Sequence, residues 1–153
     1  MRIRPVVFDT SVYIPYLRRE AYRDLVESQT RRARNRLSSV VLYELFAGTR
    51  SSTDKRLLAD LNRSFASRGY LVTPEHVEWV LAGQLLNEYG RRQGLLTPSR
   101  HLADILILIS ALRVGAVVVT ENLRNFSVWL RLLRRRRVFG TVLGVRREEH
   151  LKK

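Results

Sequence analysis

Three carboxylic acids stand inside apolar stretches of the sequence, where a charge is costly unless it is paired or binds a cation. Asp9 ends the run VVF, Glu44 lies within VVLYELF, and Asp104 lies near the start of ADILILI. Each has an ordinary explanation as well. Asp9 would cap a helix, and Glu44 would belong to the solvent side of an amphipathic helix. Asp104 would pair with Arg100, four residues earlier. Because all three interrupt apolar runs in one short chain, a shared site is the alternative hypothesis.

A site built from these acids would suit a hard cation, because Mg²⁺ and Mn²⁺ prefer carboxylate oxygens. The chain carries 28 Lys and Arg residues against 14 Asp and Glu residues, a net charge of +14. Such a charge favours a polyanionic partner, most simply a nucleic acid, although a merely basic surface would give the same count. Acids that bind a cation inside a basic protein are typical of a metal-dependent nuclease. The cation activates water, and the basic surface binds the phosphate backbone.

Apolar runs and helical stretches alternate along the chain, which predicts an α/β fold with a mainly parallel sheet. We expect strands at residues 3–8, around 37, at 70–73, at 116–119 and at 138–145, with helices between them. Asp9 would follow the first strand. Sites collect at the C-terminal ends of strands in such sheets, so this position agrees with a site.

The stretch from Arg100 to Phe126 positions two further candidates. Its first half is apolar on all sides of a helix and is therefore expected to be buried on more than one side. Gly115 ends the helix, and the buried strand at 116–119 then delivers Thr120 and the polar motif TENLRNF. We expect Ser127 to cap a last helix.

Three segments resemble the successive motifs of the PIN-domain ribonucleases. They are VVFDTSVYI, SSVVLYELFAG and LADILILISALRVGAVVVTENLRNF. Their order and spacing are most similar to the VapC-type toxins of bacterial toxin–antitoxin pairs. The resemblance implies a PIN-like three-layer α/β/α sandwich with a central mainly parallel sheet. It also implies a metal-dependent endoribonuclease that hydrolyses RNA phosphodiester bonds as the toxin of a toxin–antitoxin system.

The same resemblance assigns site residues. Asp9, Glu44 and Asp104 match the three acids that bind Mg²⁺ or Mn²⁺, and polar residues that help to shape the site match Thr10, Ser11 and Thr120. The family's fourth acid is replaced here, because both candidate positions are amides, Asn122 and Asn125. An amide oxygen still ligates a metal but brings no charge. We therefore expect Asn122 and Asn125 as neutral ligands, Asn122 and Thr120 beside the acids in catalysis, and three carboxylates unless Glu121 turns inward.

Length and composition define the remaining expectations. Residues 1–145 are predicted to form one domain, and 146–153 a loose C-terminal tail. The chain has no cysteine, which excludes disulfides and thiolate metal sites. It has no apolar run of 18 residues, so no membrane association is expected, and we predict a cytoplasmic protein. The resemblance adds three partners, namely an RNA substrate, a cognate antitoxin and a second copy in a homodimer.

A second hypothesis is a PIN-like basic module with weak or absent catalysis that binds RNA or a protein. The missing fourth acid favours this hypothesis, and the presence of the other three opposes it. Nucleotide-binding and serine-hydrolase functions have no support, because neither GxGxxG nor GxSxG occurs. His101 is expected to face solvent. Trp129 is expected in the core or in a dimer surface, with stacking on RNA bases as the alternative.

Overall fold

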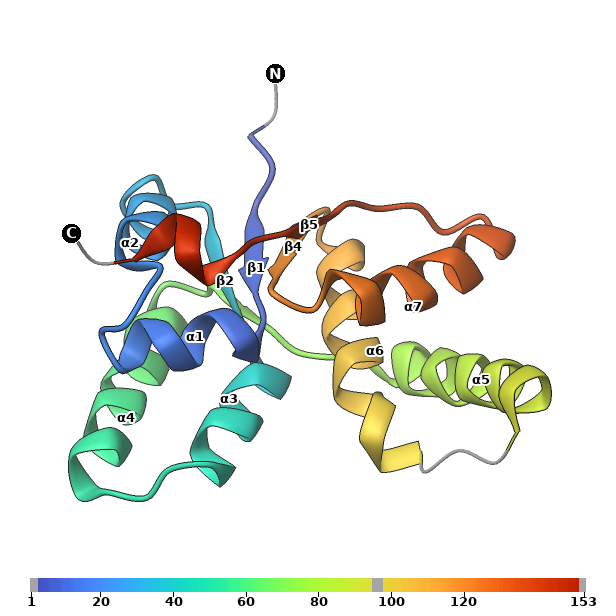
Figure 1. The fold of residues 1–153 in the computed structure, drawn as a ribbon, viewed down its shortest axis with the longest axis horizontal. Coiled ribbons are helices and arrows are strands. Elements are labelled where there is room, and N and C mark those ends of the chain that lie inside the picture. Colours follow the sequence, from blue (N-terminus) through green and yellow to red (C-terminus); the bar gives the residue numbers. More distant parts are fainter. Residues whose placement is uncertain (1–2, 95–97, 152–153) are drawn as a thin grey trace.

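A five-stranded, entirely parallel sheet runs through the molecule (Figure 1). The structure is a computed structural model that describes residues 3–94 and 98–151, with the backbone alone at 98–100. The strands follow the order β3-β2-β1-β4-β5. Their bounds are β1 (Val6–Phe8), β2 (Asn35–Ser38), β3 (Leu71–Val72), β4 (Val117–Thr120) and β5 (Val142–Gly144). The mainly parallel sheet expected from the sequence is confirmed.

Helices surround the sheet on both sides. The described helices are α1 (Thr10–Leu17), α2 (Arg23–Arg31), α3 (Ser39–Ala47), α4 (Ser52–Ser67), α5 (His76–Gln93), α6 (Pro98–Arg113), α7 (Leu123–Arg135) and the 3₁₀ helix η1 (Arg147–His150). In Figure 1, α1–α4 gather on the left and α5–α7 on the right. The chain leaves β1 toward β3 and later returns to β4 and β5 on the other side of β1. Right-handed crossovers in opposite directions place helices on opposite faces, which gives the three-layer α/β/α sandwich.

The helix predicted to be buried on several sides, α6, lies at the centre of the core. It packs against α3, α5, α7 and β4. The residues from Ile105 to Ala111 are all buried, and this run includes one polar residue, Ser110, whose hydroxyl donates to the carbonyl of Leu106 at 2.6 Å. Because a hydroxyl that bonds its own helix leaves no unpaired polar group, Ser110 is compatible with the core.

The beginnings of α3 and α7 show how two helices of the chain are capped. Ser38 caps α3, and its hydroxyl accepts hydrogen bonds from the backbone of Val40 at 3.2 Å and Val41 at 3.5 Å. The prediction for the last helix is wrong, because α7 begins at Leu123 with Asn122 in the cap position. The Asn122 carbonyl already accepts hydrogen bonds from Asn125 and Phe126. The polar motif after β4 therefore continues directly into a helix.

The C-terminal segment differs from the expectation of a loose tail. Leu151 pairs with Ala21 in an isolated antiparallel bridge, and the Tyr22 amide donates to the His150 carbonyl at 3.0 Å. Figure 1 shows this red segment beside α2, with which η1 packs. The last residues of the tail lie outside the described ones. None of the helices in the described ranges is long and apolar enough to cross a membrane.

Candidate carboxylate site

The carboxyl ends of β1 and β4 meet where the direction of the strand order reverses. From β1 the chain proceeds to β2 and β3, whereas β4 leads to β5 on the opposite side. Helices on opposite faces leave a crevice at such a switch point, which is where parallel α/β sheets bind ligands. Phe8 pairs with Val119, and the Asp9 amide donates to the Val119 carbonyl at 3.1 Å. This register places Asp9 directly beside Thr120.

Two hydroxyl groups hold the carboxylate of Asp9. Ser11 Oγ donates to Oδ1 at 2.6 Å, and Thr120 Oγ1 donates to Oδ2 at 2.9 Å. Asp9 is only 3% exposed, and this burial raises its pKa to about 6. The two hydroxyl hydrogen bonds lower the pKa and the charge of Glu44 raises it, so burial is the largest of these effects.

Glu44 and Asp104 face the same region from two other helices. Thr10 Oγ1 donates to Glu44 Oε1 at 2.7 Å, so this acid of α3 faces the start of α1 and is only partly exposed. Burial, together with the smaller effects of the charges of Asp9 and Glu44, raises the pKa of Asp104 to about 6. Because like charges act strongly only at short range, these effects indicate that the three predicted acids lie near one another. The alternative pairing of Asp104 with Arg100 involves a side chain outside the described ones.

The donor chemistry of this carboxylate cluster (Asp9, Glu44 and Asp104) fits a hard divalent cation. Mutual repulsion of buried acids is offset when a cation binds between them. Over residues 3–94 and 98–151, however, no three Asp, Glu or His side chains are placed so that they could already hold a metal ion. Both oxygens of Asp9 and Oε1 of Glu44 accept hydrogen bonds from the hydroxyl groups of Ser11, Thr120 and Thr10.

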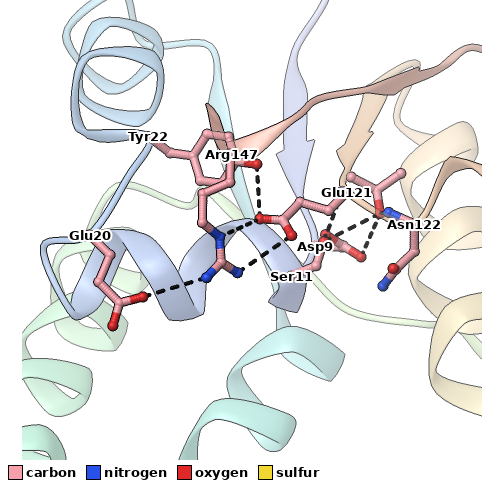
Figure 2. A network of polar contacts seen from close by, with 8 residues as sticks. Asp9, Ser11, Glu20, Tyr22, Glu121, Asn122 and Arg147 are labelled. Atoms are coloured by element: carbon pink, nitrogen blue, oxygen red, sulfur yellow. Dashed lines mark hydrogen bonds and ion pairs between the residues drawn. The ribbon is translucent and has the colours of Figure 1, made fainter. Parts of the chain in front are cut away.

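The two amides in the family's fourth-acid positions lie at the start of α7, and both are exposed. The backbone amide of Asn122 donates to Thr120 Oγ1 at 2.8 Å, which fixes the backbone of the turn beside Asp9. Figure 2 shows Asp9, Ser11 and Asn122 together at this point. Asn125 follows within the first turn of the helix.

Glu121 turns away from the carboxylate cluster. Its Oε1 accepts a hydrogen bond from the Tyr22 hydroxyl at 2.9 Å and from Arg147 Nε at 3.2 Å (Figure 2). Burial and this hydrogen bond raise the pKa of Tyr22, so the phenol stays protonated and donates. No sequence pattern identifies Tyr22 and Arg147 as partners of Glu121, because they lie 99 and 26 positions from it and share no motif with it.

The aromatic residues near α6 form core rather than site. The His101 ring lies 5.5 Å from the Trp129 ring and 5.9 Å from the Tyr89 ring and is partly exposed, so it packs on these rings as well as facing solvent. Trp129 is 2% exposed, which confirms the core position and leaves no face on which an RNA base could stack.

A separate open groove of about 750 Å³ lies between α5 and α7. Its lining includes Glu88, Arg92 and Arg136, and Glu88 forms ion pairs with Arg92, Arg135 and Arg136 at 3.6–3.7 Å. No residue of the carboxylate cluster lines it. The groove is therefore a basic surface distinct from the candidate site.

Comparisons with known proteins place the fold. DNA-bound VapBC from Salmonella typhimurium superimposes with a TM-score of 0.62 at 24% identity, covering 93% of this chain and 98% of that chain. FitAcB from Neisseria gonorrhoeae superimposes with a TM-score of 0.61 at 18% identity, covering 91% of this chain and 96% of that chain. VapBC-1 from nontypeable Haemophilus influenzae superimposes with a TM-score of 0.56 at 16% identity, and the two chains are covered to the same extent. No curated protein matches the chain significantly. The family model of the PIN domain matches residues 6–138. Since this match covers most of the sequence, the chain belongs to the PIN-domain family.

Proposed function

We propose that this protein is a metal-dependent endoribonuclease and the toxin of a toxin–antitoxin pair. The observation that carries the proposal is the buried Asp9 carboxylate at the switch point of the sheet. Glu44 and Asp104 lie near enough for their charges to interact with it. PIN domains are generally nucleases. The carboxylate cluster would hold Mg²⁺ or Mn²⁺, with Asn122 and Asn125 as neutral oxygen donors nearby.

Different residues of the chain would orient the carboxylates and accept a proton during phosphodiester hydrolysis. A bound divalent cation supplies a Lewis acid and lowers the pKa of water. Ser11 and Thr120 orient the Asp9 carboxylate through the hydrogen bonds at 2.6 and 2.9 Å. Thr10 orients Glu44 in the same way. Asp104, the third acid of the cluster, would accept the proton of the attacking water as a carboxylate. The water oxygen would bond to phosphorus as the bond from phosphorus to a ribose oxygen breaks, and the leaving ribose oxygen would take a proton from solvent.

A line of arginines supports RNA as the substrate. Arg124, Arg131 and Arg135 are exposed on α7, whose N-cap residue is Asn122. At 100° per residue they lie within about 40° of one another around the helix, and they span roughly 16 Å along it. This arginine stripe leads away from the carboxylate cluster. Arginines in a row bind successive phosphates of a nucleic acid backbone.

Exposed apolar side chains support protein partners. On α3, Tyr43 is 71% exposed and Phe46 is 40% exposed, and α5 exposes Trp79. Large exposed apolar side chains such as these are enriched at protein interfaces. The structures of VapBC and FitAcB are of complexes by their names. We therefore propose an acidic antitoxin and a second copy of the chain as partners. Light scattering of the purified protein tests the homodimer.

Cleavage of a mixed pool of structured RNAs tests the proposal. The protein is incubated with Mg²⁺, with Mn²⁺ and with EDTA, beside Asp104→Asn and the matched control Asp60→Asn. Asp60 lies on the surface in a pair with Arg63 at 3.3 Å, and such pairs contribute little. We expect cuts by the wild-type protein and Asp60→Asn in either metal, and no cuts by Asp104→Asn or in EDTA.

A binding module without catalysis is the second candidate function. The exposed amides Asn122 and Asn125 favour it, because they bring no negative charge to the place of the fourth acid. RNA that is bound but uncut in every metal would support this candidate and contradict the first. Asn122→Asp would then be the variant to test for restored cleavage.

A further inference from the structure

The side chain of Glu121 is held by the C-terminal segment of the chain. Arg147 of η1 donates from Nε to Oε1 at 3.2 Å and from Nη2 to Oε2 at 3.5 Å, and its Nη1 lies 3.5 Å from Glu20 Oε2. The Tyr22 hydroxyl donates to the same Oε1. Both carboxylate oxygens of Glu121 are therefore engaged by Tyr22 and Arg147, and Figure 2 shows them directed toward Arg147.

The backbone conformation of Tyr22 indicates that the arrangement is specific. Its φ of 69° lies in the left-handed region, which is costly for a bulky side chain unless its surroundings fix it. The C-terminal segment fixes it here through the bond from the Tyr22 amide to the His150 carbonyl and through the two rings, whose centroids are 5.3 Å apart. This conformation allows the phenol of a residue that is 1% exposed to reach Glu121.

The backbone of Glu121 is linked to Asp9 of the carboxylate cluster through hydrogen bonds of hydroxyl groups. The Glu121 amide donates to Ser11 Oγ at 2.9 Å, and Ser11 Oγ donates to Asp9 Oδ1 at 2.6 Å. The next amide, of Asn122, donates to Thr120 Oγ1, which donates to Asp9 Oδ2. Glu121 thus links η1 on one side with both hydroxyl groups that orient Asp9 on the other.

We propose that Arg147 is a positioning residue for the carboxylate cluster. By holding the Glu121 side chain outward, it fixes the 120–122 turn, and through Ser11 and Thr120 it fixes the orientation of Asp9. Arg147 itself touches neither metal nor substrate. The cleavage readout of this inference rests on the proposed function, whereas the amide-exchange readout does not.

Hydrogen exchange of the full-length, metal-free protein tests the first half of the link. In Arg147→Gln we expect the amides of Glu121 and Asn122 to exchange at least about tenfold faster, since the turn loses its outer support. Arg146→Gln is the matched control, because Arg146 is exposed and its side chain makes no hydrogen bond or ion pair within the described residues. Unchanged exchange in Arg147→Gln would overturn the proposal.

Mn²⁺ binding and cleavage test the second half. Residues that orient ligands without touching the metal typically contribute tenfold to a hundredfold to affinity or activity. In Arg147→Gln we expect about tenfold weaker Mn²⁺ affinity by electron paramagnetic resonance and a lower kcat with KM nearly unchanged. Arg147→Lys keeps the positive charge but cannot form both guanidinium hydrogen bonds to the Glu121 carboxylate. It should therefore recover part of the lost Mn²⁺ affinity and activity. Tighter Mn²⁺ binding or faster cleavage in Arg147→Gln would overturn the proposal, because Glu121 would then act as a released fourth acid.

A double-mutant cycle separates this role from a general loss of stability. If Arg147 acts through Glu121, then Arg147→Gln should have little further effect on Mn²⁺ affinity in a Glu121→Gln background. Fully additive losses would contradict the link. A wild-type protein that binds Mn²⁺ and leaves every RNA uncut would contradict the proposed nuclease, while the exchange and affinity measurements would still decide the role of Arg147.

Discussion

Asp9 shows how single residues establish the candidate site. Its carboxylate is buried, and its two oxygens accept hydrogen bonds from different segments, Ser11 beside it and Thr120 at the end of β4. These bonds favour the charged form, whereas burial favours the neutral form, and burial prevails. The result is an acid with a pKa of about 6 that a bound cation would readily ionise.

Removing the Ser11 hydroxyl should raise the pKa of Asp9 above its value of about 6, because the hydrogen bond from that hydroxyl lowers the pKa. A pH titration followed by carboxyl ¹³C NMR measures this in Ser11→Ala. Ser67→Ala is the control, since that hydroxyl bonds the carbonyl of Ser64 within α4. An unchanged Asp9 titration in Ser11→Ala would show that the hydroxyl does not act on Asp9 in solution.

Replacing Asp104 by Asn should stabilise the metal-free protein at neutral pH. The pKa of Asp104 rises from 3.8 to about 6 on folding, so protonation stabilises the folded state below pH 4, and this contribution is lost as the pH rises through 6. Asn is neutral throughout. We expect Asp104→Asn to be more stable by roughly 1–2 kcal/mol above pH 6.5, less than the full pKa difference implies because the carboxyl is partly exposed.

Urea unfolding at pH 4 and pH 7 in EDTA measures that difference, which should vanish at the lower pH. A variant that is less stable at both pH values would instead identify Asp104 as a structural ion-pair partner. The carboxylate cluster would then lose its third member.

Among the elements, α7 connects the candidate site with the basic surface. Its cap residue Asn122 belongs to the turn beside Asp9, its apolar face packs on α6 and β5, and its other face carries the arginine stripe. A helix is stiff on this length scale, so the distance between the carboxylate cluster and the outer arginines is fixed. An RNA bound along the stripe would reach the cluster in one register.

Arg131→Gln should weaken RNA binding about equally for all sequences and reduce the dependence of log K on log salt by about 0.7–1, the value for one phosphate contact. Fluorescence anisotropy with a labelled single strand between low and moderate salt measures the slope. Arg63→Gln on α4 is the matched control, because that exposed arginine lies on a different helix. Equal salt dependence of RNA binding in both variants would show that Arg131 of α7 does not contact the RNA.

At the scale of the whole molecule, the C-terminal segment contacts parts of the chain that are distant in sequence. Residues 146–151 contact the loop before α2 and Glu121 after β4, so segments from the beginning, the middle and the end of the chain meet beside the candidate site. Removal of residues 146–153 would leave the Tyr22 amide without its acceptor and Tyr22 uncovered. We expect a loss of about 1–3 kcal/mol in the free energy of unfolding, which urea denaturation measures. Unchanged stability would mean that this segment is loose in solution.

The sequence alone determined the layered fold and the three acids. Alternation of apolar strands with helices is a local signal, and α6 and β4 follow from it because burial on all sides requires an apolar run. Asp9, Glu44 and Asp104 were visible for the same reason, since a charge inside an apolar run is conspicuous. The sequence does not locate the start of α7, because Asn122 and Ser127 are both residue types that cap helices. The path of the turn after β4 determines that Asn122 takes the cap position.

Only the tertiary structure decided how the site is supported. The outward turn of Glu121, its contacts with Tyr22 and Arg147, and the burial of Trp129 depend on contacts between distant parts of the chain. No periodicity or motif encodes such contacts, because they form only when the sheet order brings the end of β4, the start of α2 and η1 together. The residues of the carboxylate cluster can therefore be named from local patterns, whereas the residues that hold it in place require the three-dimensional arrangement.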